Sequence, residues 1–214
     1  MHTTNDRHSA PGVMGRVLHS PAAYDLLAGL LLLGRERAFR EGLVTLADLE
    51  PGQSVLDVGC GTGSLAIAAK RRVGAAGTVD GLDASPEMIE AARRKAGKAG
   101  VEVTFTTGVV EALPYADGRF DVVMSTLMLH HLPSVARELC AREMRRVLKP
   151  AGRILAVDFG ASSGHGHGLF QHFHRHGNVA VEEIATLLRG AGLTILGSGP
   201  VGVRNMNFVL ATRP

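Results

Sequence analysis

The chain has 214 residues, which suits one domain with a full hydrophobic core. A hydrophobic content of 45% and a charged content of 20% indicate a globular protein and exclude a disordered one. The net charge of +3 is mildly basic, and no run of Lys and Arg with interleaved aromatic residues occurs, so we expect no nucleic-acid partner.

The cysteines and the apolar runs bear on location. Cys60 and Cys140 lie far apart, which indicates reduced thiols and no disulfide scaffold. The N-terminus lacks the charged-then-apolar pattern of a signal peptide, and the longest apolar run, Leu26 to Leu33, is too short to span a bilayer. The sequence therefore predicts a cytoplasmic protein.

The first fifty residues divide into a tail and two helical stretches. Residues 1–13 are polar and rich in turn formers, which predicts a flexible tail. A helical pattern runs from Met14 to Leu33 and again from Arg35 to Leu49, with a break near Gly34. Tyr24 stands among leucines, where its hydroxyl needs a partner, so it is a candidate for a polar role.

Residues 55–63 form the opening of a nucleotide-binding βαβ unit. An apolar, β-branched run predicts a buried strand, three glycines at alternate positions follow, and an Ala-rich stretch from Ser64 to Arg72 predicts a helix. Glycines suit a backbone that turns sharply close to a ligand. The spacing is G-x-G-x-G and not the dinucleotide pattern G-x-G-x-x-G, and Asp57 before it would repel a diphosphate and attract an ammonium group.

A second carboxylate follows the next predicted strand, Thr78 to Leu82. Asp83 lies about twenty residues past the glycines, where an acidic group accepts hydrogen bonds from ribose hydroxyls. Ser85 is the expected N-cap of the following helix, with Pro86 at its first position. These residues predict that a nucleoside lies across the ends of the first two strands.

Further strands are expected at Val101–Thr107, Phe120–Ser125 and Ile154–Phe159, with a helix beginning at Ser134 and a turn at Leu148–Arg153. The pair His130 and His131 follows the fourth strand at its carboxyl end, where α/β sheets bind ligands. Imidazole is suited to accept a proton at neutral pH, but a histidine here can equally fix the loop through a backbone carbonyl.

The last part of the chain begins with a low-complexity segment. Five histidines, at 165, 167, 172, 174 and 176, lie among glycines, followed by a predicted helix at Val181–Ala191 and strands at Leu193–Leu196 and Met206–Ala211. The alternation of strands with helices predicts a doubly wound α/β sheet with no second domain.

The run from residue 54 to residue 159 resembles the class I S-adenosylmethionine (SAM) methyltransferases, because four separate motifs occur in the family's order. Residues 24–63 are most similar to the ubiquinone/menaquinone C-methyltransferase (methyltransferase type 11) group. The resemblance implies a single-domain, Rossmann-like, seven-stranded sheet that is mostly parallel with the last strand antiparallel. It also implies a helical cap at 14–49, a SAM-binding domain at 50–214 and a His-rich lid at 160–178.

The same resemblance implies SAM as cofactor, with S-adenosylhomocysteine as product, and assigns its ligands. These are Asp57, Gly59, Gly61, Thr62, Gly63, Asp83, Ala84, Met88, Gly108, Val109, Val110 and Ser125. Val109 departs from the family pattern, in which an Asp contacts the adenine amino group. The candidate catalytic residues are His130, His131 and Tyr24, and no metal site is expected.

The resemblance implies a small-molecule acceptor: a quinone-like ring, a lipid amine or a secondary metabolite. Contact with a membrane surface follows if the acceptor is a lipid or a quinone. Two other classes stay open. One is a non-catalytic SAM-binding or metal-responsive protein that uses the His-rich segment. The other is an NAD-dependent oxidoreductase, against which the glycine spacing and Asp57 count.

Overall fold

The computed structural model describes residues 20–32, 34–160, 180–203 and 205–214, so the predicted tail and the five clustered histidines lie outside the described residues. The elements in chain order are α1 (Pro21–Leu31), α2 (Glu36–Leu46), β1 (Ser54–Val58), α3 (Ser64–Val73), β2 (Thr78–Asp83), α4 (Pro86–Ala99), β3 (Thr104–Thr107), β4 (Phe120–Thr126), the 3₁₀ turn η1 (Leu129–His131), α5 (Ser134–Val147), β5 (Leu148–Phe159), α6 (Val181–Gly190), β6 (Thr194–Pro200) and β7 (Met206–Thr212).

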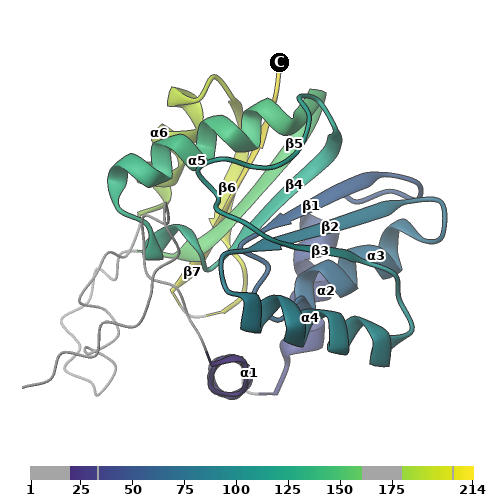
Figure 1. The fold of residues 1–214 in the computed structure, drawn as a ribbon. Coiled ribbons are helices and arrows are strands. Elements are labelled where there is room, and N and C mark those ends of the chain that lie inside the picture. Colours follow the sequence, from purple (N-terminus) through teal and green to yellow (C-terminus); the bar gives the residue numbers. More distant parts are fainter. Residues whose placement is uncertain (1–19, 33, 161–179, 204) are drawn as a thin grey trace, which may run out of the picture.

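Seven strands form one sheet in the order β3-β2-β1-β4-β5-β7-β6 (Figure 1). β1 lies between β2 and β4 and runs parallel to both, with Val55 opposite Val79 on one side and Val122 on the other. β7 runs antiparallel to β5 and β6. The predicted doubly wound, Rossmann-like sheet with an antiparallel last strand is confirmed.

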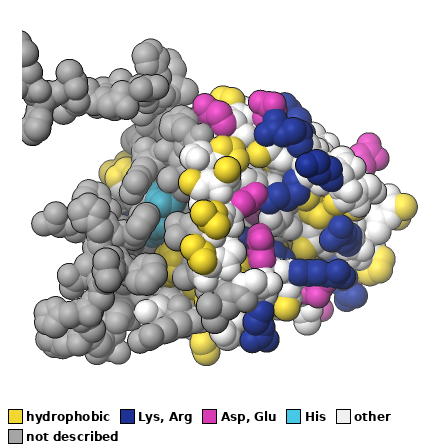
Figure 2. Space-filling view, turned by 90° about the horizontal axis from the view of Figure 1, so that it is seen from below, with side chains coloured by type: hydrophobic (Ala, Val, Ile, Leu, Met, Phe, Trp, Pro, Cys, Tyr) yellow, Lys and Arg dark blue, Asp and Glu magenta, His cyan; other side chains and the backbone are white. Residues whose placement is uncertain are grey.

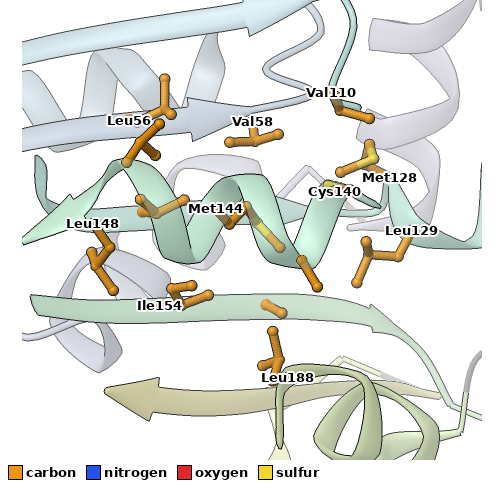
Figure 3. Close-up of a cluster of buried hydrophobic side chains, with 14 of the residues drawn as sticks. Leu56, Val58, Val110, Met128, Leu129, Cys140, Met144, Leu148, Ile154 and Leu188 are labelled. Atoms are coloured by element: carbon orange, nitrogen blue, oxygen red, sulfur yellow. The ribbon is translucent and has the colours of Figure 1, made fainter. Parts of the chain in front are cut away.

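Helices cover both faces of the sheet: α2, α3 and α4 lie on one side and α5 and α6 on the other (Figure 1). Alternate residues of β1 serve the two layers, as the pleat of a strand requires. Val55 belongs to the buried cluster with side chains of α2 and α3, whereas Leu56 and Val58 belong to the cluster with Cys140 of α5 (Figure 3). The alternation places Asp57 on the face covered by α2.

The prediction of a turn at Leu148–Arg153 was wrong, because these residues form the first half of β5. Leu148 pairs with Phe120 of β4, and Arg153 pairs with Thr212 of β7. Ala151 has φ +59°, and its N–H donates to the carbonyl of Arg213 at 2.8 Å. The Pro-Ala-Gly run is an irregularity inside a strand whose pairing is completed by the C-terminal strand.

The two N-terminal helices flank the predicted break near Gly34, which has φ +73°. Pro21 occupies the first turn of α1, where a missing N–H costs nothing. α2 ends at Leu46, three residues earlier than expected, and Asp48 just beyond it has φ +52°. Within the described residues, every helix is too short or too polar to cross a membrane.

Candidate functional site

The Gly-rich turn after β1 leaves one side of the backbone open. Gly63 has φ +78°, and a Cβ there would lie 2.8 Å from the ring of Phe105, so packing and backbone both demand glycine. Gly61, with φ +52°, faces only the ring of Tyr24, 3.5 Å from the place of its missing Cβ. The turn is held to β2 by the N–H groups of Gly59 and Cys60, which both donate to the carbonyl of Leu82.

Asp83 joins the turn to the end of β2. Its Oδ2 accepts a hydrogen bond from the N–H of Gly61, and its Oδ1 accepts one from the N–H of Ser85, each at 2.9 Å. Burial raises the pKa of Asp83, and the backbone N–H groups of Ser85, Gly61 and Ala84 oppose that shift. The Ser85 hydroxyl caps α4 by accepting from the N–H of Met88, which lies fully buried. The carboxylate is thereby fixed beside the glycines.

Asp57 is buried on the neighbouring strand, and its Oδ2 has no hydrogen-bond partner among the described residues. Burial raises its pKa to about 7, Arg40 and the backbone amide of Ala66 oppose the shift, and Asp83 adds to it. Arg40 comes from α2 and is itself buried, with an unpartnered Nε. An arginine and two carboxylates therefore meet beneath the turn.

Arg40 is a site residue that the sequence did not reveal. It lies three residues after Arg37, which is exposed and paired with Glu41 at 2.8 Å. Phe39 and Leu43 share the buried side of the same helix. The available signal was a charged residue next to the apolar positions of an amphipathic helix, which places it at the edge of the buried side. A buried arginine requires a partner, so this position indicated a nearby carboxylate.

Helix α1 covers the Gly-rich turn. Burial raises the pKa of Tyr24 above its ordinary value, opposed mainly by Arg40, which also hydrogen-bonds its side chain. The hydroxyl of Thr62 donates to Oδ1 of Asp25 at 2.6 Å, and Lys95 of α4 lies 3.0 Å from the other oxygen of that carboxylate. Thr62, a predicted cofactor ligand, thus has its hydroxyl engaged with α1.

The remaining cavity between α1 and the turn is small. It measures about 10 Å³, which is roughly the space for one water molecule. Residues lining it come from α1, α2, β1, the Gly-rich turn, the start of α3 and the end of β4: Tyr24, Arg40, Asp57, Gly59, Cys60, Thr62, Ser64, Leu65 and Thr126. The arrangement brings one predicted catalytic residue, Tyr24, against several predicted cofactor ligands.

The other predicted ligands lie at the ends of β3 and β4. Gly108 donates to the carbonyl of Asp83 at 3.0 Å, which holds the loop after β3 against the end of β2. Val109 is half-buried, whereas the side chain of Val110 packs into the core with Leu113. Ser125 is buried, and its hydroxyl has no partner among the described residues.

The two histidines lie on η1, beyond the end of β4. Nδ1 of His130 lies 2.6 Å from Oδ1 of Asp158, a buried residue near the end of β5. The rings of His130 and His131 are 3.9 Å apart, and Phe159 packs edge-on against His130 at 5.3 Å. Among the described residues these are the only histidines, and a histidine side chain is visible on the face shown in Figure 2. The sequence analysis considered a backbone carbonyl as the partner of these histidines and did not predict Asp158.

A family model described as a methyltransferase domain matches residues 55–152. Over 158 residues the chain is 35% identical to the ubiquinone/menaquinone biosynthesis C-methyltransferase UbiE of Paraburkholderia phymatum, an alignment that covers 73% of this chain and 64% of that protein. The demethylmenaquinone methyltransferase of Halalkalibacterium halodurans is 35% identical over 63% of this chain and 55% of its own length. The chain therefore contains a methyltransferase domain and resembles the class I SAM-dependent methyltransferases.

Solved structures agree on the fold of this chain. A SAM-dependent methyltransferase from Aquifex aeolicus superposes with a TM-score of 0.75 at 22% identity, covering 92% of this chain and all of that one. The aligned part of the chain spans 64% of the length of the Paraburkholderia phymatum relative, which is less than two thirds. The chain therefore shares a methyltransferase domain and its fold with these proteins, and the molecule that accepts the methyl group has to be inferred separately.

The residues of this chain fit SAM, the cofactor of the class I methyltransferases that it resembles. Gly61 leaves room at the turn that a Cβ would fill, and the unpartnered Oδ2 of Asp57 suits an ammonium group. Backbone N–H groups of Gly61, Ser85 and Ala84 take up to three of the about four acceptor positions of the Asp83 carboxylate, which leaves capacity for a hydroxyl donor. Within the described residues, no cluster of three or more His, Cys, Asp or Glu side chains could hold a metal ion.

Proposed function

We propose that this protein transfers a methyl group from SAM to a small-molecule acceptor. The observation that carries the proposal is the pair of carboxylates, Asp57 and Asp83, that flank the Gly-rich turn at the adjacent ends of β1 and β2. A diphosphate would be repelled at this place, whereas a ligand with an ammonium group at one end and ribose hydroxyls at the other matches both acids.

Most of the predicted ligands then have a role that their position supports. Asp57 accepts the ammonium group, Asp83 accepts the ribose hydroxyls, and the backbone from Gly59 to Gly63 lies along the methionine end. The backbone of Val109 and the side chain of Met88 contact the adenine. When bound, SAM supplies a methyl group on a positively charged sulfur. The protein's task is therefore to hold and orient the two reactants and to exclude water.

Helix α1 acts as a cap that opens for binding. Small-molecule sites usually measure about 300–1,000 Å³, far more than the cavity beneath α1. The contacts of Asp25 with Thr62 and Lys95 are polar and partly exposed, so water can replace them at small cost. α1 is thus the element that moves, and it carries Tyr24 with it. The predicted lid at 160–178 lies, apart from Gly160, outside the described residues.

The acceptor that the relatives favour is a quinone-like ring. Two relatives are named for methyl transfer in ubiquinone and menaquinone biosynthesis or to demethylmenaquinone. A ring of this kind in its reduced form carries hydroxyl groups, which make the ring nucleophilic. A lipid amine and a secondary metabolite are the alternatives that an acceptor assay separates.

Calorimetric titration of the purified protein with SAM tests the cofactor site. Asp83→Asn keeps an acceptor for one of the two backbone N–H groups, of Gly61 and Ser85, and removes the charge, so we expect SAM affinity to fall roughly 10–100-fold while the variant still folds and shows a cooperative thermal transition. Asp121→Asn is the matched control, because Asp121 binds Ser54 and Lys149 at the opposite end of the sheet. Equal affinities in wild type and Asp83→Asn would refute this assignment.

A second variant tests the adenine contact. Val109 is half-buried, so Val109→Asp should be tolerated, and a carboxylate there can accept a hydrogen bond from the adenine amino group. We expect an unchanged melting temperature and tighter SAM binding. Loss of SAM binding would mean that this side chain packs against the ligand in another way.

Methyl transfer itself is measured with isotope-labelled SAM and three probes: a short-chain naphthohydroquinone, ethanolamine and catechol. We expect label to enter the hydroquinone. Label in ethanolamine would assign a lipid-amine acceptor instead. Tight SAM binding without transfer to any probe or to a cell extract would favour the non-catalytic alternative.

A further inference from the structure

The carboxylate of Asp158 is held by three donors at the carboxyl end of β5. Its Oδ2 accepts from the N–H of His130 at 3.1 Å, and its Oδ1 accepts from the N–H of Phe159 at 2.8 Å. The imidazole Nδ1 of His130 lies 2.6 Å from the same Oδ1. The side chain of Asp158 is fully buried, so no solvent competes for these contacts.

These contacts fix which nitrogen of His130 carries hydrogen. Two backbone N–H groups stabilise the ionised carboxylate, and an ionised carboxylate can only accept hydrogen bonds. Nδ1 must therefore be the donor, which leaves the lone pair of the neutral ring on Nε2. Nε2 lies on the side of the ring away from Asp158, and the side chain of His130 remains 16% exposed.

The position of the ring is fixed as well as its hydrogen. Phe159 packs on it edge-on at 5.3 Å, and the ring of His131 lies against it at 3.9 Å. Arg137 of α5 donates to the carbonyls of Leu129 and Leu132, which anchors both ends of the turn that carries the histidine. The ring is thus held with the lone pair of Nε2 turned away from Asp158, at the carboxyl ends of β4 and β5, where open α/β sheets bind their ligands.

We infer that His130 is the proton acceptor of the methyl transfer and that Asp158 is the positioning residue that orients it. This inference rests on the proposed function, and it narrows the acceptor to molecules whose nucleophile must lose a proton. A phenol or hydroquinone belongs to that class, whereas a tertiary amine does not.

The step balances without a further reactant. The acceptor's nucleophilic atom forms a bond to the methyl carbon while the carbon–sulfur bond breaks, and the electron pair of that bond stays on sulfur as a neutral thioether. The proton that the acceptor loses goes to Nε2 of His130. The resulting imidazolium is paired with Asp158 until it returns the proton to water.

One substitution separates catalysis from a structural role. The amide nitrogen of Asn can take the place of Nδ1, so His130→Asn keeps the hydrogen bond to Asp158 and removes Nε2. If the pair only anchors η1 to β5, this variant keeps full activity. If His130 is the base, we expect kcat on the naphthohydroquinone to fall roughly 10²–10⁴-fold, with the SAM affinity within twofold of wild type.

Asp158→Asn tests the positioning role. An amide can donate to Nδ1 and so move the hydrogen to Nε2, and we expect kcat to fall by at least roughly 10-fold with a smaller change in KM. Asp121→Asn, an acid paired with Lys149 at the opposite end of the sheet, is the matched control and should keep wild-type kcat.

The hydrogen position is measured without SAM or acceptor. In protein labelled with ¹⁵N-histidine, two-bond ¹H–¹⁵N correlations should show His130 with hydrogen on Nδ1 in wild type and on Nε2 in Asp158→Asn, with the signal identified by its loss in His130→Asn. Hydrogen on Nε2 in wild type, or wild-type kcat in His130→Asn, would overturn the inference. A wild-type protein that binds SAM and methylates no probe would instead defeat the proposed function.

Discussion

The buried carboxylate of Asp57 should make SAM binding depend on pH. Burial holds its pKa near 7, and an ammonium group is attracted by the ionised form alone. With a pKa of about 7, the ionised fraction rises from about 3% at pH 5.5 to about 50% at pH 7. We therefore expect the affinity for SAM to rise about 15-fold over this interval, or about 1.6 kcal/mol.

Protonation of Asp57 should have opposite effects on the stability of the fold and on SAM binding. The pKa of Asp57 in the folded protein lies above its ordinary value of 3.8, so the proton stabilises the fold. That contribution is complete below about pH 4 and is lost as the pH rises through about 7. SAM favours the ionised form, so its binding should release a proton near neutral pH. The interval ends at pH 7 because the amino group of a free amino acid itself begins to lose its proton near pH 8.

Calorimetry measures both consequences. Titrations at pH 5.5 and pH 7 give the affinities, and titrations near pH 6.5 in two buffers of different ionisation enthalpy give the number of protons released. Asp57→Asn should bind SAM weakly and with a much smaller pH dependence across this interval, since the remaining acid at the turn is Asp83, whose pKa is also raised by burial. The control Asp121→Asn should keep the wild-type slope, because hydrogen bonds from Lys149 and Ser54 lower the pKa of Asp121 despite partial burial. A wild-type affinity that is the same at both pH values would refute the reasoning.

Two further predictions concern stability and are checked by thermal or denaturant unfolding. Gly63→Ala places a methyl group 2.8 Å from the ring of Phe105 at a positive φ, so the free energy of unfolding should fall by roughly 1–3 kcal/mol. Gly97→Ala is the contrasting variant on α4, because a Cβ there has no atom within 4 Å, and it should raise the free energy of unfolding by up to about 1 kcal/mol. Arg119→Met leaves the buried carboxylate of Asp80 without its bidentate partner and should cost roughly 1–3 kcal/mol at pH 7, with a smaller loss in acid, where Asp80 is protonated.

The sheet and the two acids of the Gly-rich turn were predictable because their signals are local. A strand, a turn and a helix N-terminus each occupy a few consecutive residues, and Asp57 and Asp83 lie inside such patterns. Arg40 and Asp158 were missed for the opposite reason. Arg40 meets Asp57 only after α2 folds over the sheet, and Asp158 meets His130 only through the pairing of β4 with β5.

The same reasoning explains the irregular half of β5. Pro150 and Gly152 are typical of a turn, and nothing near them in the sequence indicates the strand that pairs with them. That partner is β7, and the backbone of its neighbour Arg213 accepts a hydrogen bond from the N–H of Ala151 and donates one to the carbonyl of Gly152. Local propensity was overruled by a contact about sixty residues away.

The strand order has a consequence for how such proteins diverge. β1 lies between β2 and β4 in the strand order. The acids proposed to hold the methyl donor therefore come from the half of the sheet made of β1 and β2, and His130 and Asp158 come from the half that contains β4 and β5. The two groups are also separate in the sequence, before and after Gly118. Substitutions or a recombination event in the C-terminal half can therefore alter the acceptor while the donor half is inherited unchanged. One inherited donor site can in this way serve many reactions.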